Sequence, residues 1–513
     1  MLTKRNENRV QSEIVCIEDL VPKGHLLRKI DAAVDFTKIY EIVEKLYCND
    51  NGRPSTDPVV LFKTAIIQHL YGISSLRRTA EEISLNVAYR WFLGYSLMER
   101  TPHFTTLSNN FCHRFTEETV ERVFNWILSE INKAGCLSPE AVFIDGTHIK
   151  ANANMKKAVK KAIPEAAKVY GEQLLEEINQ DRENHDRKPL ENNKPPKEKI
   201  ITESATDSEC GVFHKGEHKK CFAYAAQTAC DKNGYVLDVT LNPGNVHDSV
   251  AFDGLYDKLC EAFPEMRYVV ADAGYKTPWI AKRVIDDGRI PVLPYKRPMG
   301  KDGFFRPYEF VYDEYYDCVL CPENSVLKYT TTTREGYRQF KSDPDICQNC
   351  PSRYKCTENK NCVKTVEKHV WANYLELVED YRHTPPLRKL YEYRKETIER
   401  VFADAKEKCA MRFTYLKGLT RNIGWVRLKF AAMNLKKYAI HKWHLCDYSP
   451  TTGFLVFSLL SLNFKPHFLG GNGVFLQSGY IILYFYGFVY KKSADKIFFK
   501  NRLTNLHGRA IIY

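Results

Sequence analysis

The sequence has 513 residues, of which 44% are hydrophobic and 27% are charged, the balance of an ordinary globular protein of two to four domains. Its net charge of +12 suggests an anionic partner, either nucleic acid or a membrane surface. The N-terminal residues contain no apolar signal core, so export is not expected, and the 16 cysteines are better explained as free thiols and metal ligands than as disulfides.

Residues 15 to about 135 are predicted to be helical. In one of these helices Thr56 or Asp57 is the cap, Pro58 holds the first position and Gly72 lies just past the end. One face of this helix is expected to be buried, because its apolar residues recur at helical spacing: Val59, Phe62, Ile66 and Leu70.

Residues 76–92 have the outline of a helix-turn-helix, with a short helix, a turn near residues 84–86 and a second helix rich in aromatic side chains. Three basic side chains in this segment could reach DNA phosphates: Arg77, Arg78 and Arg90. The alternative is a plain helical bundle with solvated arginines, because such outlines also arise by chance.

Asp145 lies in the stretch FIDGTHIKAN, directly after an apolar run. The pattern predicts a β-strand that ends at Asp145 and is followed by a tight turn. A single aspartate in this position is most often a turn or cap residue. A metal-binding role for Asp145 therefore depends on carboxylates elsewhere in the chain.

The sequence changes character after Asp145. The stretch KKAVKKA, residues 156–162, is basic and amphipathic, and the charged, Pro-rich residues that follow predict a helix that runs into an exposed linker near 180–200. From about residue 200 the pattern is that of β-strands. Two extended runs are joined at residues 231–234, where the Asn-Gly pair is a strong hairpin signal.

A strand–helix–strand unit follows. Residues 268–271 form a short apolar strand that ends at Asp272, Thr277 caps a helix that Gly288 closes, and residues 290–294 resume a strand. This order favours a parallel pair and an α/β core. Open α/β sheets bind ligands at the carboxyl ends of their strands, so Asp272 and Asp145 are expected to converge.

A third carboxylate is needed, because a two-metal site for phosphoryl chemistry uses about three of them and Mg²⁺ prefers oxygen ligands. Glu399, in a strongly helical stretch over residues 391–419, is the candidate. Lys406 lies two turns later on the same face and would meet a DNA phosphate or base edge. Arg394 and Lys395 add positive potential before it. Glu396 is the main rival for the third ligand, and Asp248 is interpreted as a cap or supporting residue.

A cluster of cysteines predicts a structural zinc site. Two CxxC pairs, with 25 residues between them, are typical of a zinc ribbon whose knuckles are separated by an extended hairpin. The zinc candidates are Cys318, Cys321, Cys347, Cys350 and Cys356, with Cys362 also nearby. A set of reduced thiols is the alternative, since six cysteines exceed the four that one zinc ion needs.

Taken together, these motifs resemble bacterial insertion-sequence transposases of the DDE class over roughly residues 10 to 442. The resemblance is carried by GRPSTDPVVLFK, FIDGTHIKANAN, GNVHDS, VVADAGY and KETIERVFADAK. The family commonly places Tyr, Arg, Glu and Lys at fixed steps. The step from Glu399 to Lys406 fits, but Lys395 holds the Arg position and Tyr391 comes one place early.

The resemblance implies a fold and a domain order. It implies an α/β RNase H-like catalytic core, an all-α N-terminal domain that binds DNA, and a small cysteine-rich, zinc-ribbon-like β insertion. The expected boundaries are 1–135 for the helical domain, 136–315 and 365–445 for the catalytic domain with a charged insert at about 160–200, 316–364 for the cysteine-rich insert, and 446–513 for an apolar tail of unassigned role.

The resemblance also implies an activity. Two Mg²⁺ or Mn²⁺ ions, held by Asp145, Asp272 and Glu399, would support cleavage of the 3′ ends of an insertion sequence and strand transfer into target DNA. His148 and Lys150 are further candidates for DNA contact. The expected partner is double-stranded DNA, as terminal inverted repeats and as target, bound by a homodimer or larger assembly in the cytoplasm at the nucleoid. Two alternatives stay open: a catalytically inactive DNA-binding derivative, and an RNase H-like nuclease without strand transfer.

The C-terminal tail does not fit this pattern. It contains two strongly apolar stretches, of which the second is close to the lower length limit for a membrane span. Interior Gln477, Ser478 and several tyrosines weaken that interpretation, and a dedicated membrane partner is not expected. A peripheral extension, a dimer surface and read-through sequence are the alternatives.

Overall fold

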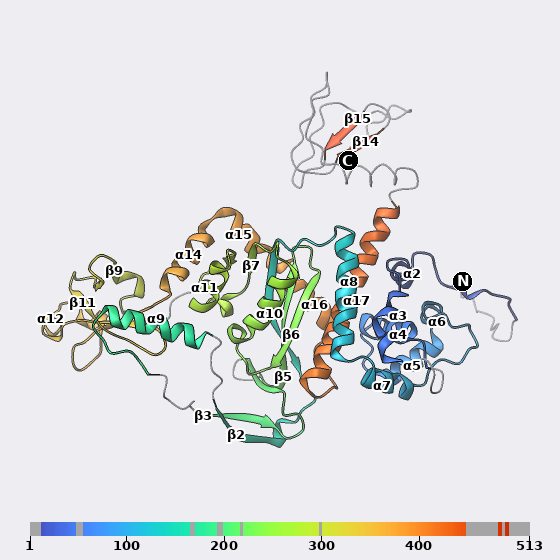
Figure 1. Ribbon diagram of the computed structural model, residues 1–513, viewed down its shortest axis with the longest axis horizontal. Coiled ribbons are helices and arrows are strands. Elements are labelled where there is room, and N and C mark those ends of the chain that lie inside the picture. The colour runs from blue at the N-terminus through green and yellow to red at the C-terminus, as the bar shows by residue number, and fades with distance from the viewer. Residues whose placement is uncertain are drawn as a thin grey trace, which may run out of the picture. The chain divides into compact units, whose positions relative to one another are not determined.

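The computed structural model describes residues 12–47, 55–164, 170–191, 198–215, 219–296, 300–447, 481–484 and 488–491 (Figure 1). Contacts between residues divide the chain into two units, Met1–Trp443 and His444–Tyr513. Each unit is described by itself, and the candidate site lies in the first.

The N-terminal part of the first unit is helical, as predicted. Asp57 caps α4 by accepting a hydrogen bond from the backbone N–H of Val59 at 2.7 Å, with Pro58 in the first turn. A single residue, Asn86, separates the two helices of the predicted helix-turn-helix, and its side chain caps the second one. The helices are α1 (Ile17–Leu20), α2 (Leu26–Asp31), α3 (Lys38–Val43), η1 (Glu44–Leu46), α4 (Pro58–Leu70), α5 (Leu76–Leu85), α6 (Val87–Leu93), α7 (Phe104–His113) and α8 (Glu117–Lys133).

The centre of the unit is a mixed six-stranded sheet. The strands run in the order β4-β5-β1-β7-β8, and β6 pairs with β5. Strands β1, β7 and β8 are parallel, whereas β5 is antiparallel to β1 and β6. The bounds are β1 (Ala141–Lys150), β4 (Gly211–Lys215), β5 (Lys219–Asp231), β6 (Val236–Pro243), β7 (Tyr268–Val270) and β8 (Ile290–Val292). The predicted hairpin between β5 and β6 and the predicted strand–helix–strand unit are both confirmed.

The sheet is covered on both faces. Along β1, Val142 and Ile144 pack in one apolar cluster with α10 (Asp248–Ala262), α11 (Pro278–Asp286) and η3 (Ala273–Tyr275). Phe143 and Ile149 point the other way, into a cluster shared with the N-terminal helices and with α16 and α17. Burial on both faces explains why this strand is a continuous apolar run rather than an alternating one.

The prediction that β1 ends at Asp145 in a tight turn is wrong. The strand continues to Lys150, and Gly146–Lys150 pair with Gln227–Ala223 of β5. The reason is the length of β5, whose 13 residues offer backbone partners well beyond Asp145. Thr147 and Ile149 are buried on one face, which stabilises the extension.

The basic stretch after β1 is a strand, not the start of a helix. Following η2 (Met155–Lys157), β2 (Ala158–Pro164) pairs with β3 (Glu198–Ser204) as a separate antiparallel ribbon. The predicted charged helix is confirmed further on as α9 (Gly171–Asn184). The β-branched and apolar residues of β3 supply a strand partner, which helical periodicity in residues 156–162 does not reveal.

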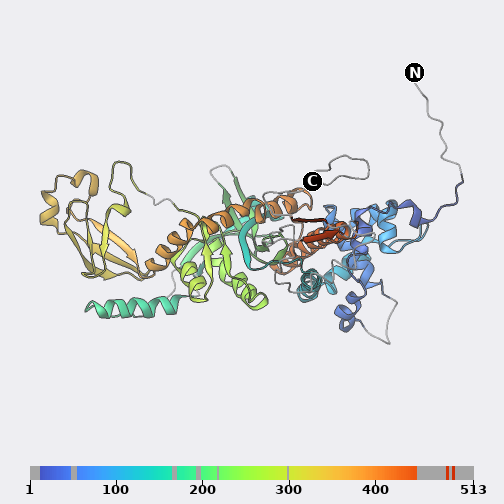
Figure 2. The same ribbon diagram turned by 90° about the horizontal axis from the view of Figure 1, so that it is seen from above.

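The cysteine-rich insert is a five-stranded antiparallel sheet against which α9 packs (Figure 2). As predicted, an extended hairpin, β11–β12, separates the two CxxC pairs. The sheet reaches beyond the predicted bounds of 316–364, because β9 and β13 pair at its edges. This region contains η4 (Pro307–Glu309), β9 (Val311–Asp313), β10 (Cys318–Leu320), β11 (Val326–Thr332), β12 (Tyr337–Lys341), α12 (Pro344–Gln348), α13 (Arg353–Cys356) and β13 (Thr365–His369).

The last part of the unit is helical but interrupted. It comprises α14 (Ala372–His383), α15 (Pro385–Glu392), η5 (Tyr393–Lys395), α16 (Ile398–Glu407) and α17 (Leu419–Asp447). The single helix predicted over residues 391–419 is therefore broken at Thr397, whose φ and ψ are −107° and −99°, and again after α16. The buried hydroxyl of Thr397 donates to the carbonyl of Tyr393 at 2.7 Å and satisfies this break locally.

Most of the apolar tail, including Gln477 and Ser478, lies outside the described residues. The described pieces are β14 (Ile481–Tyr484) and β15 (Phe488–Lys491), which pair in antiparallel fashion. Among the helices of the described residues, none is long and apolar enough to cross a membrane.

Candidate functional site

The register of the sheet brings Asp145 and Asp272 together. Strands β1 and β7 are parallel, and Phe143 lies opposite Val270. Two residues further along each strand, this register places Asp145 beside Asp272. The backbone N–H of Gly274 donates to Asp272 Oδ1 at 2.7 Å, so the turn after β7 fixes the orientation of this carboxylate.

Asp145 is held in a largely buried setting. Its Oδ1 accepts from the Gly146 N–H at 2.8 Å, and its Oδ2 accepts from Arg394 Nη2 at 2.6 Å. The exposed fractions of the Asp145 and Arg394 side chains are 17% and 8%. Burial raises the pKa of Asp145 to about 6; Arg394 opposes this rise, and the charges of Asp272 and Asp248 add to it.

Asp248 is the third carboxylate at this position. The buried Tyr275 hydroxyl donates to Gln227 Oε1, and Gln227 Nε2 donates to Asp248 Oδ1 at 2.6 Å. Asp248 is not the helix cap, which is His247. A Cβ on Gly146 would lie 2.6 Å from Asp248 Oδ1, so glycine at this position of β1 leaves the space that Asp248 occupies.

Glu399 and Lys406 lie on α16, as the sequence predicts, and α16 packs against β1. Phe402 and Ala405 form the buried side of this helix, whereas Glu399 and Glu396 are exposed. The structure thus brings Asp145, Asp272 and Asp248 close to Arg394, while Glu399 is exposed in the first turn of α16. Within the described residues, no group of three or more His, Cys, Asp or Glu side chains is arranged to hold a metal ion.

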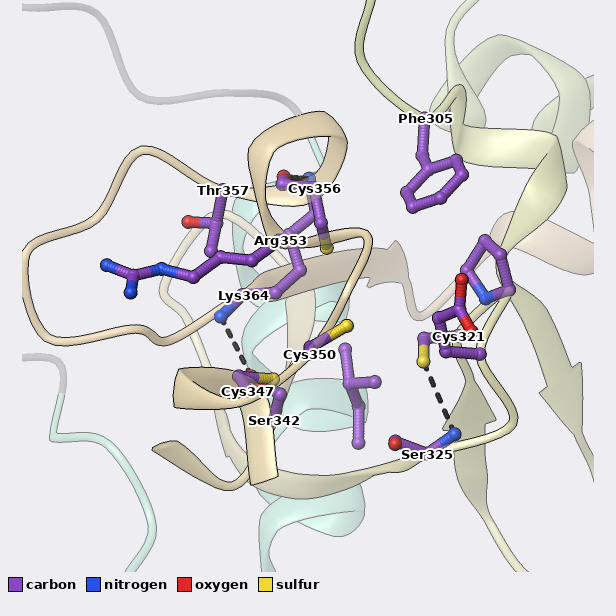
Figure 3. Close-up of a pocket in the computed structure, with 13 residues that line it drawn as sticks. Phe305, Cys321, Ser325, Ser342, Cys347, Cys350, Arg353, Cys356, Thr357 and Lys364 are labelled. Atoms are coloured by element: carbon purple, nitrogen blue, oxygen red, sulfur yellow. Dashed lines mark hydrogen bonds between the residues drawn. The ribbon is translucent and has the colours of Figure 1, made fainter. Parts of the chain in front are cut away.

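Four of the cysteines of the insert border one small cavity of about 20 Å³ (Figure 3). They are Cys321, Cys347, Cys350 and Cys356. Burial raises the pKa of the Cys356 thiol; Lys364 opposes this rise, and the other three cysteines add to it. Cys321 Sγ accepts the backbone N–H of Ser325 at 3.3 Å. Cys318 and Cys362 are buried and do not line this cavity.

Two segments of the chain match families of known proteins. Residues 15–113 match the family described as Transposase domain (DUF772), and residues 320–439 match the family described as Transposase DDE domain. The chain is related to insertion-sequence transposases of the DDE class. No curated protein and no solved structure matches it. The segment matched to the DDE domain contains Glu399 and Lys406 and all four cavity cysteines.

The candidate DNA contacts lie in different settings. Arg77 and Arg78 are exposed on α5, where Arg77 lies over the ring of Phe104 and Arg78 pairs with Glu82 at 3.5 Å. Arg90 is buried, and its guanidinium donates to the carbonyls of Ser84, Ser96 and Glu99. In this structure Arg90 therefore holds the helical domain together and does not reach solvent.

Two of the other candidates lie at the C-terminal end of β1. The His148 ring stacks on Phe213 with 3.7 Å between ring centroids, and Lys150 is exposed. Lys395 is exposed in η5, while the neighbouring Arg394 forms an ion pair with Asp145.

Sequence reasoning missed two residues of the candidate site, Gln227 and Tyr275. Both are fully buried and polar. A glutamine between alanines and threonine in an apolar strand is a weak signal of a supporting hydrogen bond, because buried amides require partners. The identity of the partner, Asp248, becomes visible only when α10 is packed against β5.

Proposed function

We propose that the chain is a DNA transposase that binds the terminal inverted repeats of an insertion sequence and catalyses metal-dependent 3′-end cleavage and strand transfer into target DNA. The observation that carries the proposal is the parallel register that sets Asp145 beside Asp272, on a sheet face covered by the helix that carries Glu399. The family matches at both ends of the chain support the same function.

An RNase H-like classification of the core belongs to this proposal. It is supported by the order β6-β5-β1-β7-β8, in which two antiparallel strands adjoin three parallel ones. The carboxylates lie on the central strand of that order and at the end of its parallel neighbour, the position at which open α/β sheets bind ligands.

The donor atoms fit Mg²⁺ or Mn²⁺, because the clustered side chains offer carboxylate oxygens. Two such ions, when bound, would activate the attacking oxygen and stabilise the leaving oxygen. Asp145, Asp272 and Glu399 would hold them, with Asp248 as a neighbour fixed by Gln227 and Tyr275. The guanidinium of Arg394 must leave Asp145 first. Once released, Arg394 is within reach of the same phosphate-bearing region and can pair with a DNA phosphate.

Strand cleavage and joining test the proposal. Purified full-length protein is incubated with Mg²⁺, a target plasmid and a duplex that carries the inverted repeat bracketing the coding region. We expect the wild type to nick the repeat end and join it to the plasmid. Asp145→Asn, Asp272→Asn and Glu399→Gln should each lower the rate at least about a hundredfold, because each removes a charged ligand from the transition state. Asp302→Asn, at an almost fully exposed carboxylate, is the control.

The pattern of outcomes separates the alternatives. Cleavage without joining points to a nuclease, and binding without cleavage points to an inactive derivative. Equal rates in Asp145→Asn and the wild type would discard the catalytic assignment. Asp248→Asn tests the role of Asp248. If Asp248 ligates a metal, this variant should lose as much cleavage rate as Asp272→Asn. If Asp248 only supports the site, the cleavage rate should fall less.

A structural zinc ion in the insert is a second part of the proposal. The four cavity cysteines supply the four thiolates of a tetrahedral site, and a space of about 20 Å³ accommodates one ion. The four thiols surround this space but are not yet close enough together to coordinate one ion, so zinc binding would draw them together. We expect purified protein to carry one zinc per chain by elemental analysis.

Removal of this zinc should loosen the insert. Cys350→Ser should lose the metal and expose the insert to proteolysis, because metal binding and folding are coupled in such sites. Cys318→Ser is the matched control, since Cys318 lies in the same insert but away from the cavity. Metal-free protein as isolated under reducing conditions would contradict the zinc assignment.

The partner within this proposal is double-stranded DNA. The net charge of +12 and the exposed arginines of α5 support it. Two transposon ends must be joined in one reaction, so a homodimer or larger assembly on DNA is proposed, and light scattering of the DNA complex measures it.

A further inference from the structure

We propose that the ribbon formed by β2 and β3 enters a groove of duplex DNA. This inference rests on the proposed function and deepens it by assigning a DNA contact to a segment outside the core sheet. The ribbon is a two-stranded antiparallel sheet of its own, with Val159 opposite Glu203 and Lys161 opposite Ile201. It lies beyond the end of β1 and the start of β5, apart from the core sheet (Figure 1).

The base of the ribbon is anchored in the protein. Ala151, Phe222 and Tyr224 belong to a small buried cluster where β1 ends and β5 begins. Met155 and Ala158 pack against this cluster. The backbone N–H of Ala205 donates to the carbonyl of Lys157 at 3.1 Å, which closes the base of the ribbon. The root is therefore fixed to the strand that carries Asp145.

The described side chains of the ribbon are strongly basic. Four exposed lysines follow one another along η2 and β2: Lys156, Lys157, Lys160 and Lys161. Lys161 pairs with Glu203 at 3.1 Å, and the Lys161 side chain is still 58% exposed. Lysines so closely spaced repel one another, and phosphates spaced along a duplex neutralise them.

The ribbon also exposes apolar side chains. Val159 is 56% exposed and Ile200 is 70% exposed, and the register places them on opposite faces. An isolated two-stranded ribbon is marginally stable in water, since it has no core of its own. The major groove of B-DNA admits a two-stranded β-ribbon, and its walls would cover both faces while the lysines contact phosphates at the rims.

The surface next to the ribbon also exposes a basic and an aromatic side chain. Lys150, at the end of β1, is exposed, and its backbone pairs with the loop after α16: its N–H donates to Arg412 O at 3.1 Å and its carbonyl accepts from Thr414 N at 3.0 Å. Tyr415 in the same loop is 62% exposed. Eight residues of chain lead from Lys150 to Ala158, so DNA at the ribbon would extend along this surface.

Salt-dependent binding of full-length protein to duplex DNA tests the inference. One duplex carries the terminal repeat and one is an unrelated sequence of equal length. The ribbon variant replaces Lys156, Lys157, Lys160 and Lys161 with Gln. The control variant makes the same change at four scattered exposed lysines, Lys38, Lys133, Lys328 and Lys360. Unchanged thermal unfolding confirms that both variants fold.

We expect the ribbon variant to bind both duplexes about ten- to a hundredfold more weakly at 0.1 M salt. The slope of log K against log [salt] should fall by about 2 to 4, since each phosphate contact contributes about 0.9. The control variant should change the slope by less than about 1. Equal slopes in the two variants would overturn the inference.

A footprint on the wild type gives a second measurement that needs no variant. Duplex DNA should protect the ribbon lysines from acetylation, as read by mass spectrometry, and leave Lys328 and Lys360 reactive. Ribbon lysines that stay reactive in saturated complexes would refute the contact. Binding to DNA without cleavage or joining would instead count against the proposed function and leave the ribbon result standing.

Discussion

At the scale of single residues, Arg394 neutralises part of the negative charge of the acidic site. Its guanidinium pairs with Asp145 and is 8% exposed, so two carboxylates that would repel each other share one positive charge. This arrangement makes a guanidinium and a divalent ion competitors for the same oxygen atoms.

Arg394→Gln should therefore tighten Mg²⁺ binding by about tenfold, because no ion pair has to be broken first. The same variant should cleave DNA more slowly, since the displaced arginine is then missing from the phosphate. Thermal shift against Mg²⁺ concentration measures the first effect and end cleavage the second. Lys395→Gln, at the exposed neighbour, should leave metal affinity unchanged. Unaltered Mg²⁺ affinity in Arg394→Gln would show that the pair does not compete with the metal.

The residue scale also shows what a sequence can reveal about this site. Asp145, Asp272 and Glu399 are visible because each follows a recognisable local pattern. The Asp145–Arg394 pair joins residues 249 positions apart in the chain, and the Gln227–Asp248 bond depends on how α10 packs against β5. Local patterns do not contain these long-range partners, so the sequence predicts the acids but not what surrounds them.

At the scale of secondary-structure elements, caps and turns were predictable and strand partners were not. Asp57 before Pro58 and Asn233-Gly234 between β5 and β6 act through neighbours a few residues away, which explains why both are confirmed. The extension of β1 and the pairing of β2 with β3 depend on partners 34 to 81 residues away.

A buried lysine on α17 gives an element-scale prediction about pH. Lys429 is 2% exposed, donates to the carbonyl of Cys409 and lies 4.2 Å from the ring centroid of Trp425. Burial lowers its pKa from 10.5 to about 8, with the Cys409 thiol opposing the change. The folded protein thus binds fewer protons than the unfolded chain between pH 8 and 10.5, so stability attributable to Lys429 rises with pH across that window.

Lys429→Met should remove this contribution, which is on the order of 3 kcal/mol across the full window. Relative to Lys429→Met, the wild type should gain urea resistance between pH 8 and 10, measured by tryptophan fluorescence. Lys389→Met, at an exposed position on α15, serves as the control and should follow the wild type. If the urea resistance of the wild type and of Lys429→Met changed with pH in the same way, the pH dependence could not be assigned to Lys429.

At the scale of the whole first unit, one arginine joins the helical region to the sheet. Arg427 on α17 is 1% exposed. Its Nη2 lies 2.9 Å from Glu121 of α8 and 3.8 Å from Asp238 of β6, and its Nη1 lies 3.7 Å from Glu117. Lys258 of α10 pairs with Glu121 at 3.2 Å, so four elements meet at this network.

Arg427→Met should destabilise the protein by about 3 to 5 kcal/mol, because it leaves Asp238 buried without its counter-charge. Burial raises the pKa of Asp238 and Arg427 opposes that rise, so the loss of stability in the variant should grow as pH increases. Scanning calorimetry should show the helical region unfolding ahead of the sheet. Arg427→Lys keeps the positive charge and should lose less stability than Arg427→Met. A single, unshifted transition in Arg427→Met would mean that the network does not couple the two regions.

Under the proposed function, the length of β1 sets a spacing along the DNA. Lys150 lies five positions after Asp145, and at a rise of about 3.4 Å per residue the strand holds them about 17 Å apart. Base pairs advance by a similar step along B-DNA, so the same interval corresponds to about five base pairs. Because β1 is paired with β5 from Val142 to Lys150, it would hold the proposed metal-binding carboxylate and the proposed DNA contact at a fixed separation.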